Sequence, residues 1–253
     1  MKRKIDGKAK KERSPEALRG TGARASAYTY QPIDASRRQV RLLTVKHGSG
    51  NKKIQCSIKH ASLVSYPKPE FEAVSYCWGD PSERACIEID GTIVDVPSSS
   101  EKVLRRLRLP KTDRTLWIDA VCINQNDNEE KAGQVGIMGD VYSTATGTVI
   151  WLGEADDSTQ DALHAMQCIR EQQQEEARGF ASLKEVLHDK QGDISRSKTG
   201  LPSSCDTDAL QTFFARPWFQ RLWVVQEAVL NPKAICYCGK YEMYWTDISR
   251  TAA

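Results

Sequence analysis

The regular alternation of short apolar segments with helical ones constrains this chain more than any other feature. Segments of strand length lie within residues 71–81, 115–123, 148–152 and 234–237, and a helical pattern separates each from the next. Strands that alternate with helices are typical of layered folds built on a parallel sheet. We therefore expect an α/β fold in which a mainly parallel sheet carries helices on both faces.

Helix boundaries are marked by specific residue types. Residues 98–109 begin with the capping-box pair Ser98 and Glu101, and Pro110 follows them. A second helix is expected from about residue 127 to 142, and a third over 217–230, where a proline occupies the first turn.

Further strands are expected on the flanks of the sheet. Residues 40–45 and 54–58 predict two short strands, and 241–245 a hairpin partner for the strand at 234–237. Residues 85–96 predict a second hairpin that turns at Asp90-Gly91, and we expect it to hang from the fold as an insertion.

Composition excludes several classes of protein. The chain is 40% hydrophobic with a mean hydropathy of −0.54, values typical of globular proteins. No apolar run approaches the roughly 18–20 residues that span a bilayer, so no membrane partner is expected.

Residues 1–27 form a basic tail that we expect to be disordered, because it contains few large apolar residues. Its first 24 residues hold nine Lys or Arg and three acids, whereas the whole chain carries +3, so the remainder is mildly acidic. That balance argues against a nucleic-acid partner for the folded part. No apolar stretch of a signal peptide follows, so a cytoplasmic location is predicted. The tail is a solvated leader, a nuclear-import signal or a polyanion patch.

Eight cysteines in a chain without a secretory signal indicate reduced thiols rather than a disulfide framework. His164 and Cys168 lie four residues apart on a predicted helix, but two ligands do not make a structural zinc site. No metal is therefore expected.

The expected site lies at the carboxyl ends of the strands, where open parallel sheets bind ligands. Four segments should converge there: Ser75 to Asp80 after the first core strand, Asp119 to Gln125 at the end of the second, Gly153-Glu154 after the third, and the helix that carries Glu227. The polar side chains of these segments are either solvated loop residues or a site.

Glu227 is the sharpest candidate, because its predicted helix is apolar nearly all round. Trp218, Leu222, Val225 and Val229 form one stripe at helical spacing, and Glu227 points to the opposite side. A carboxylate in the last turn also faces the negative end of the helix dipole, which costs about 0.3–1 kcal/mol. Glu227 therefore serves a site, or it pairs with Arg221 or another cation.

Asp119 and three tryptophans are the next candidates. Asp119 interrupts an apolar run, so we expect it at the strand tip, where it binds a ligand or accepts hydrogen bonds from nearby backbone amides. Trp78, Trp151 and Trp223 lie near strand ends or on the helix of Glu227. Their rings suit the stacking of a nucleobase or nicotinamide, but tryptophan is also a common core residue, and the core is the favoured place for each of them.

Four ordered motifs resemble the fungal heterokaryon-incompatibility (HET) domain. They are FEAVSYCWGD at 71–80, LWIDAVCINQ at 116–125, WLG at 151–153 and RPWFQRLWVVQE at 216–227. The resemblance covers residues 28–245 and places one domain at 28–253, with an insertion or lid at about 155–205, where the family varies in length. Glycines at 133, 136 and 139 are less typical of the family.

The resemblance implies a role in non-self recognition and regulated cell death. HET domains also look like distant relatives of Toll/interleukin-receptor (TIR) domains, which have a flavodoxin-like fold, and several TIR domains cleave NAD with a glutamate on the helix before the fourth strand. Glu227 matches that position, so NAD is the expected substrate and no cofactor is needed. Ser75, Trp78, Gly79, Asp119, Asn124, Trp151 and Trp223 are the expected binding residues. Trp78 or Trp151 would stack on a ring, and Asn124 or Asp119 would bind the sugars.

Two other classes of function stay open at this point. A non-catalytic scaffold would use the same fold for self-association, as a homo-oligomer, or for docking an activating or incompatibility partner protein. A nucleic-acid-binding function would rest on the basic tail alone.

Overall fold

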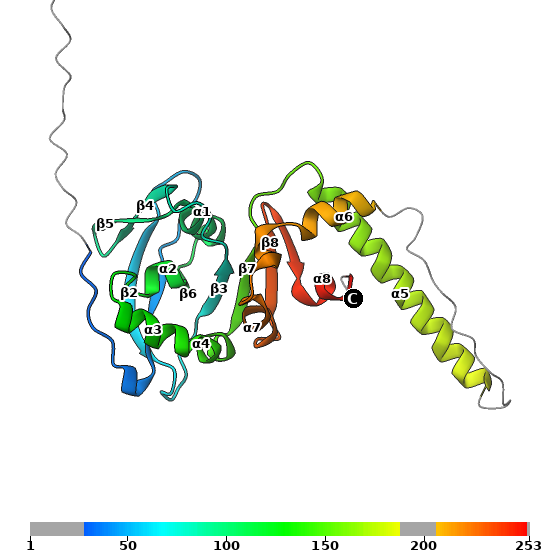
Figure 1. Cartoon of the computed structure of the whole chain (residues 1–253), viewed down its shortest axis with the longest axis horizontal. Coiled ribbons are helices and arrows are strands. Elements are labelled where there is room, and N and C mark those ends of the chain that lie inside the picture. The colour runs from blue at the N-terminus through cyan, green and yellow to red at the C-terminus, as the bar shows by residue number, and fades with distance from the viewer. Residues whose placement is uncertain (1–27, 188–205, 252–253) are drawn as a thin grey trace, which may run out of the picture.

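The computed structural model describes residues 28–187 and 206–251, and within them nine strands form one mixed sheet (Figure 1). The order across the sheet is β5-β4-β2-β1-β6-β3-β7-β8-β9. The strands are β1 (Gln39–Val45), β2 (Gln55–Ser62), β3 (Glu72–Tyr76), β4 (Arg84–Ile89), β5 (Thr92–Pro97), β6 (Arg114–Trp117), β7 (Gly147–Trp151), β8 (Ala234–Cys238) and β9 (Tyr241–Tyr244). The central strands β6, β3, β7 and β8 run parallel, which confirms the expected fold class.

Helices cover both faces of the parallel strands. They are α1 (Ser98–Leu107), α2 (Asp119–Cys122), α3 (Asn128–Gly136), α4 (Met138–Thr144), α5 (Thr159–Leu187), α6 (Thr207–Phe214), α7 (Val224–Val229) and α8 (Trp245–Thr251), with 3-10 helices η1 (Ala35–Arg37) and η2 (Pro217–Gln220). Tyr76 of β3 points toward α1, where its hydroxyl lies 2.7 Å from that of Ser100. Since strand neighbours point to opposite faces, Ser75 faces the other side, and there Trp218 of η2 contacts it.

The strand order creates a crevice at one place on the sheet edge. The chain passes from β3 to β6 on one side of β3, and then returns to β7 on its other side. When the connections that follow two adjacent strands lead in opposite directions across the sheet, a crevice opens outside the carboxyl ends of those two strands. Open α/β sheets bind ligands in this crevice. Here those strands are β3 and β7, so the topology selects the residues that follow Tyr76 and Trp151.

Two hydrophobic clusters hold these layers together. The larger one joins β1, β3 and β6 to α1, whose buried residues Val103, Leu104 and Leu107 form the predicted stripe. The smaller one lies between β7 and β8 and the helices α5, α6, η2, α7 and α8. Figure 1 shows α5 extending well beyond the body of the domain, so the packing of its first turns, through Ala162 and Met166, anchors it. None of the helices in the described ranges is both long and apolar enough to cross a bilayer.

The hairpin at β4 and β5 turns at Asp90-Gly91 as predicted, with both residues at positive φ. The expectation that it hangs from the fold is wrong. β4 pairs in parallel with β2 through Gln55 and Cys56, so the hairpin extends the sheet. The reason is burial, because Ile87 and Ile89 are fully covered and belong to the main core.

Two predicted boundaries and one predicted helix cap also differ from the structure. The strand expected over 115–123 ends at Trp117, and α2 follows it directly. The helix expected over 127–142 is two helices that meet at Ile137, where ψ is 10°. No side chain caps the N-terminus of α1, so the capping box is wrong; Glu101 instead pairs with Arg105 one turn later.

Candidate functional site

Glu227 lies in the interior of the protein, beneath the carboxyl end of β3. Its exposed fraction is 2%, and its carboxylate accepts hydrogen bonds from the Ser75 hydroxyl and from both terminal nitrogens of Arg221, each of the latter at 3.2 Å. The Trp218 indole donates to the Ser75 oxygen at 2.7 Å. Trp218, Ser75, Glu227 and Arg221 thus form one buried hydrogen-bonded network, which we call the Glu227 network.

A break in the predicted helix over 217–230 makes this network possible. η2 ends at Gln220, Arg221 adopts an extended conformation with ψ 135°, and α7 begins only at Val224. The expected apolar stripe is therefore wrong: Leu222 is 87% exposed and Val229 67% exposed. Glu227 is in the first turn of α7, so it does not face the negative end of a long helix. The pairing with Arg221, one of the two alternatives, is what the structure contains.

Arg221 partly closes the network toward solvent. Its side chain is 27% exposed, against 2% for that of Glu227, and it also donates to the Tyr76 carbonyl at 2.8 Å. A buried carboxylate is strongly destabilising unless a cation or hydrogen-bond donors compensate it. Arg221 and Ser75 supply both kinds of compensation, so Glu227 is stable in this conformation without a ligand.

Asp119 lies beside the network, at the first residue of α2, so its predicted place at the strand tip is confirmed. Its carboxylate accepts the Ala120 amide at 2.7 Å and the Trp78 indole N–H at 3.0 and 3.1 Å. Burial, with a smaller contribution from the charge of Glu227, raises the pKa of Asp119 to about 6 despite these two donors. The two carboxylates are therefore close enough to interact.

The raised pKa of Asp119 predicts a pH dependence of stability. An unfolded Asp has a pKa of about 3.9, so between pH 4 and 6 the folded protein binds more protons, and its stability falls as the pH rises through that window. Asp119→Asn should remove this loss. We expect urea unfolding at pH 4.5 and 7 to give the wild type an extra decrease on the order of 1–2 kcal/mol relative to the variant. The same decrease in both proteins would contradict the pKa shift.

A pocket of about 230 Å³ lies at the carboxyl ends of β3 and β7, where the strand order places the crevice. We call it the aromatic pocket, because Trp78, Trp151 and Trp218 line it, together with Cys77, Gly79, Gly153 and Glu154 among others. Trp78 is 38% exposed and presents part of its ring, whereas Trp151 is 5% exposed. Glu227 does not line this pocket; Trp218 and Ser75 connect the two.

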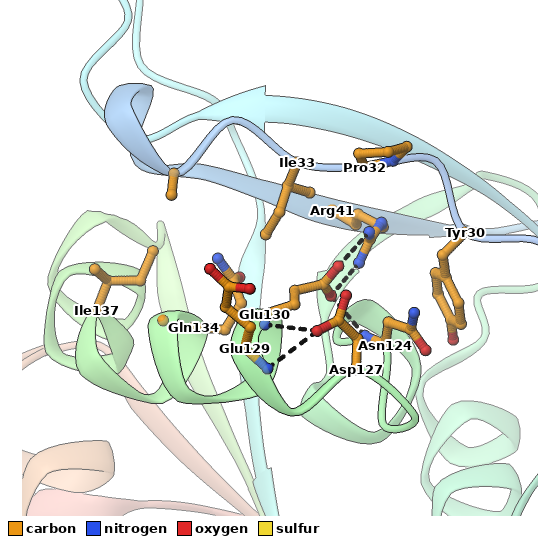
Figure 2. Close-up of a pocket in the computed structure, with 12 residues that line it drawn as sticks. Tyr30, Pro32, Ile33, Arg41, Asn124, Asp127, Glu129, Glu130, Gln134 and Ile137 are labelled. Atoms are coloured by element: carbon orange, nitrogen blue, oxygen red, sulfur yellow. Dashed lines mark hydrogen bonds and ion pairs between the residues drawn. The ribbon is translucent and has the colours of Figure 1, made fainter.

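The remaining expected site residues divide between this pocket and other places. Ser75 belongs to the Glu227 network, and Trp78, Gly79 and Trp151 line the aromatic pocket. Asn124 lies elsewhere, in a second pocket beside α3, where its backbone amide donates to Glu130 (Figure 2). Trp223 is 45% exposed and lines neither pocket.

Arg41 is one of the residues that line the second pocket (Figure 2). Its side chain is 1% exposed and makes a two-point ion pair with Glu130, at 2.6 and 2.8 Å, while Tyr30 stacks on its guanidinium. These contacts hold the segment around Tyr30 against β1 and α3. Asp127 caps α3 through the Glu129 and Glu130 amides, which confirms the predicted helix start.

Sequence reasoning missed two members of the site. Trp218 was expected on an apolar stripe on the side of the helix opposite Glu227, and Cys77 was not singled out, although it is half-buried in the aromatic pocket. The pKa of the Cys77 thiol is raised above its ordinary value, chiefly by burial. The charge of Arg221 opposes this increase, and the charge of Glu227 adds to it. Among the described residues no group of three or more His, Cys, Asp or Glu side chains is placed to hold a metal ion.

Comparison with known proteins assigns these features to a family. The family model described as heterokaryon incompatibility protein (HET) matches residues 71–227, from the start of β3 through Glu227. The chain belongs to the HET family. Both strands of the crevice and the whole Glu227 network lie inside the match, so they are parts of the HET domain itself.

One curated relative of this HET domain is heterokaryon incompatibility protein 6, OR allele, of Neurospora crassa. It is 33% identical over 214 residues, which cover 74% of this chain and 31% of the relative. The chain thus spans about a third of the relative's length. No solved structure matches the chain.

Proposed function

We propose that this HET domain acts in heterokaryon incompatibility, as part of non-self recognition that ends in regulated cell death, and that it does so by cleaving NAD. Family membership and the likeness to the Neurospora crassa incompatibility protein support the first part. One observation supports the second: an aromatic pocket lies at the carboxyl ends of β3 and β7, where open α/β sheets bind ligands, and a buried glutamate is linked to its wall through Ser75 and Trp218.

The aromatic pocket suits one end of NAD. The exposed part of the Trp78 ring offers a surface on which a nicotinamide or adenine ring would stack. The indole N–H of Trp78 donates to both carboxylate oxygens of Asp119, which fixes that ring. A stacking surface that is already held in place loses little conformational entropy when a ligand binds.

Cleavage of NAD at its nicotinamide bond is favoured by a negative charge near the ribose. When the bond between ribose C1′ and the nicotinamide nitrogen breaks, nicotinamide leaves with the bonding electrons and positive charge develops on the sugar. Water then adds to C1′ and releases a proton. A carboxylate held close to the sugar stabilises the developing charge, and Glu227 is the carboxylate that we assign to this role.

Catalysis by Glu227 requires Arg221 to move. Arg221 occupies both carboxylate oxygens, so the ribose reaches Glu227 only after that side chain swings toward solvent. Arg221 is partly exposed, whereas Ser75 and Trp218 are buried, so this is the side from which the network would open. The arrangement described here is then the resting, closed form of the site.

The release of nicotinamide tests this proposal. Purified protein incubated with NAD should release nicotinamide, and Glu227→Gln should slow the release by about 100-fold or more, as expected when a group that stabilises the transition state is lost. Glu70→Gln is the matched control, because Glu70 is exposed and outside the site. Equal turnover by wild type and Glu227→Gln would contradict the role of Glu227.

A non-catalytic scaffold is the second candidate, and the pairing of Glu227 favours it. The carboxylate has Arg221 and Ser75 as partners and needs no ligand to be stable. A protein of this kind releases no nicotinamide under any condition, and its killing activity survives Glu227→Gln. Substitutions on its association surface abolish killing instead.

A further inference from the structure

We propose that the aromatic pocket is one half of a longer groove, and that the other half binds the phosphates of a nucleotide through Lys102. This inference rests on the proposed function. It adds a binding site for the phosphates, a part of the ligand for which the aromatic pocket has no room. The second half is a pocket of about 370 Å³ beside α1, lined by Lys102, Arg105, Arg106, Trp151, Glu154, Gly239 and Lys240. We call it the basic pocket.

The two pockets are neighbours that share part of their walls. Lys102, Trp151 and Glu154 line both of them. The aromatic pocket, at about 230 Å³, is smaller than the roughly 300 Å³ from which ligand sites usually begin. A ligand that binds its ring there must therefore extend outward, and the shared residues show the direction: along Trp151, over α1.

Lys102 has the properties of a phosphate ligand. It is exposed on α1, and within the described part of the chain its ammonium group makes no ion pair. Its neighbours are already occupied, since Arg105 pairs with Glu101 and Arg106 pairs with Glu242. Among the described residues, Lys102 is thus a cation without an ion-pair partner that lines both pockets, and an ammonium group bound to a phosphate gains charge-assisted hydrogen bonds.

Two further charges define how a nucleotide would lie. Lys240, which lines the basic pocket and not the aromatic pocket, adds a second cation, with its ammonium group 5.2 Å from the centre of the Tyr241 ring. Glu154 is an exposed acid at the shared wall. Its carboxylate would repel a phosphate but would accept hydrogen bonds from ribose hydroxyls, as acidic residues near strand ends do in dinucleotide sites. Trp78 lines the aromatic pocket alone, whereas Glu154 and Lys102 line both pockets, so we assign the ring to Trp78, the ribose to Glu154 and the phosphate to Lys102.

The test compares two ligands that lack nicotinamide, so it does not depend on turnover. ADP-ribose carries the diphosphate, and adenosine does not. Calorimetric titration should show that wild-type protein binds ADP-ribose more tightly than adenosine, and that Lys102→Glu weakens ADP-ribose binding by about ten-fold or more while leaving adenosine unchanged. Lys131→Glu is the matched control, because it makes the same change of charge at an exposed position of α3, outside both pockets.

Each outcome separates this inference from the proposed function. If wild type does not prefer ADP-ribose, or if Lys102→Glu and Lys131→Glu behave alike, the phosphate site is wrong, whatever the protein does with NAD. If binding of ADP-ribose depends on Lys102 but no nicotinamide is released from NAD, the phosphate site stands and the proposed cleavage fails.

Discussion

Trp218→Ala is expected to destabilise the domain by about 3–5 kcal/mol, the usual cost of removing a large aromatic side chain from a core. Trp218 is 1% exposed and packs edge-on against Phe219 and Trp245. Its indole N–H also donates to Ser75, so the substitution removes one arm of the Glu227 network together with the packing. Urea unfolding at neutral pH measures the change in the free energy of unfolding.

Trp218→Phe separates the two contributions. It keeps most of the apolar volume and removes the indole N–H, so we expect a cost of about 1 kcal/mol from the lost hydrogen bond plus a smaller packing loss. A cost for Trp218→Ala no greater than that of Trp218→Phe would mean that the side chain does not support the smaller hydrophobic cluster as described.

Arg221→Met is expected to destabilise the domain by about 2–3 kcal/mol, because it leaves the buried Glu227 carboxylate without its cation. The figure lies below the cost of breaking a fully buried pair, since the Arg221 side chain is 27% exposed. The double variant Arg221→Met/Glu227→Gln should recover part of the loss, because a neutral amide needs no cation.

Arg84→Met is the control for that experiment. Arg84 pairs with Asp95 on the surface, with side chains 42% and 60% exposed, so its loss should cost less than about 1 kcal/mol. Equal losses for Arg221→Met and Arg84→Met, or no recovery in the double variant, would contradict the view that Arg221 compensates a buried charge.

The strands of the fold could be predicted because a strand that is buried on both faces of the sheet consists of consecutive apolar residues. Each strand of the parallel core shows as an apolar run, and the Asp90-Gly91 turn marks its hairpin. No residue pattern of this kind marks the break between η2 and α7. Arg221, Leu222 and Trp223 are compatible with a helix, and the extended conformation of Arg221 is stabilised by Glu227 and the Tyr76 carbonyl, which are contacts between distant segments.

The candidate site was predicted in part for similar reasons. Strand ends converge by topology alone, so Trp78, Gly79 and Trp151 could be placed together, and Ser75 and Glu227 do meet. Asn124 was misplaced because the residues before it were expected to continue a strand. Instead α2 turns the chain toward α3 and carries Asn124 to the second pocket.

A crystal structure of the Glu227→Gln variant with NAD bound tests the central claim most directly, because slowed cleavage should leave the ligand intact. We expect a ring of NAD against Trp78, the diphosphate beside Lys102, and Arg221 turned away from position 227. NAD bound at another surface, or a crevice that stays empty at saturating NAD with Arg221 still in place, would contradict the assignment of this site.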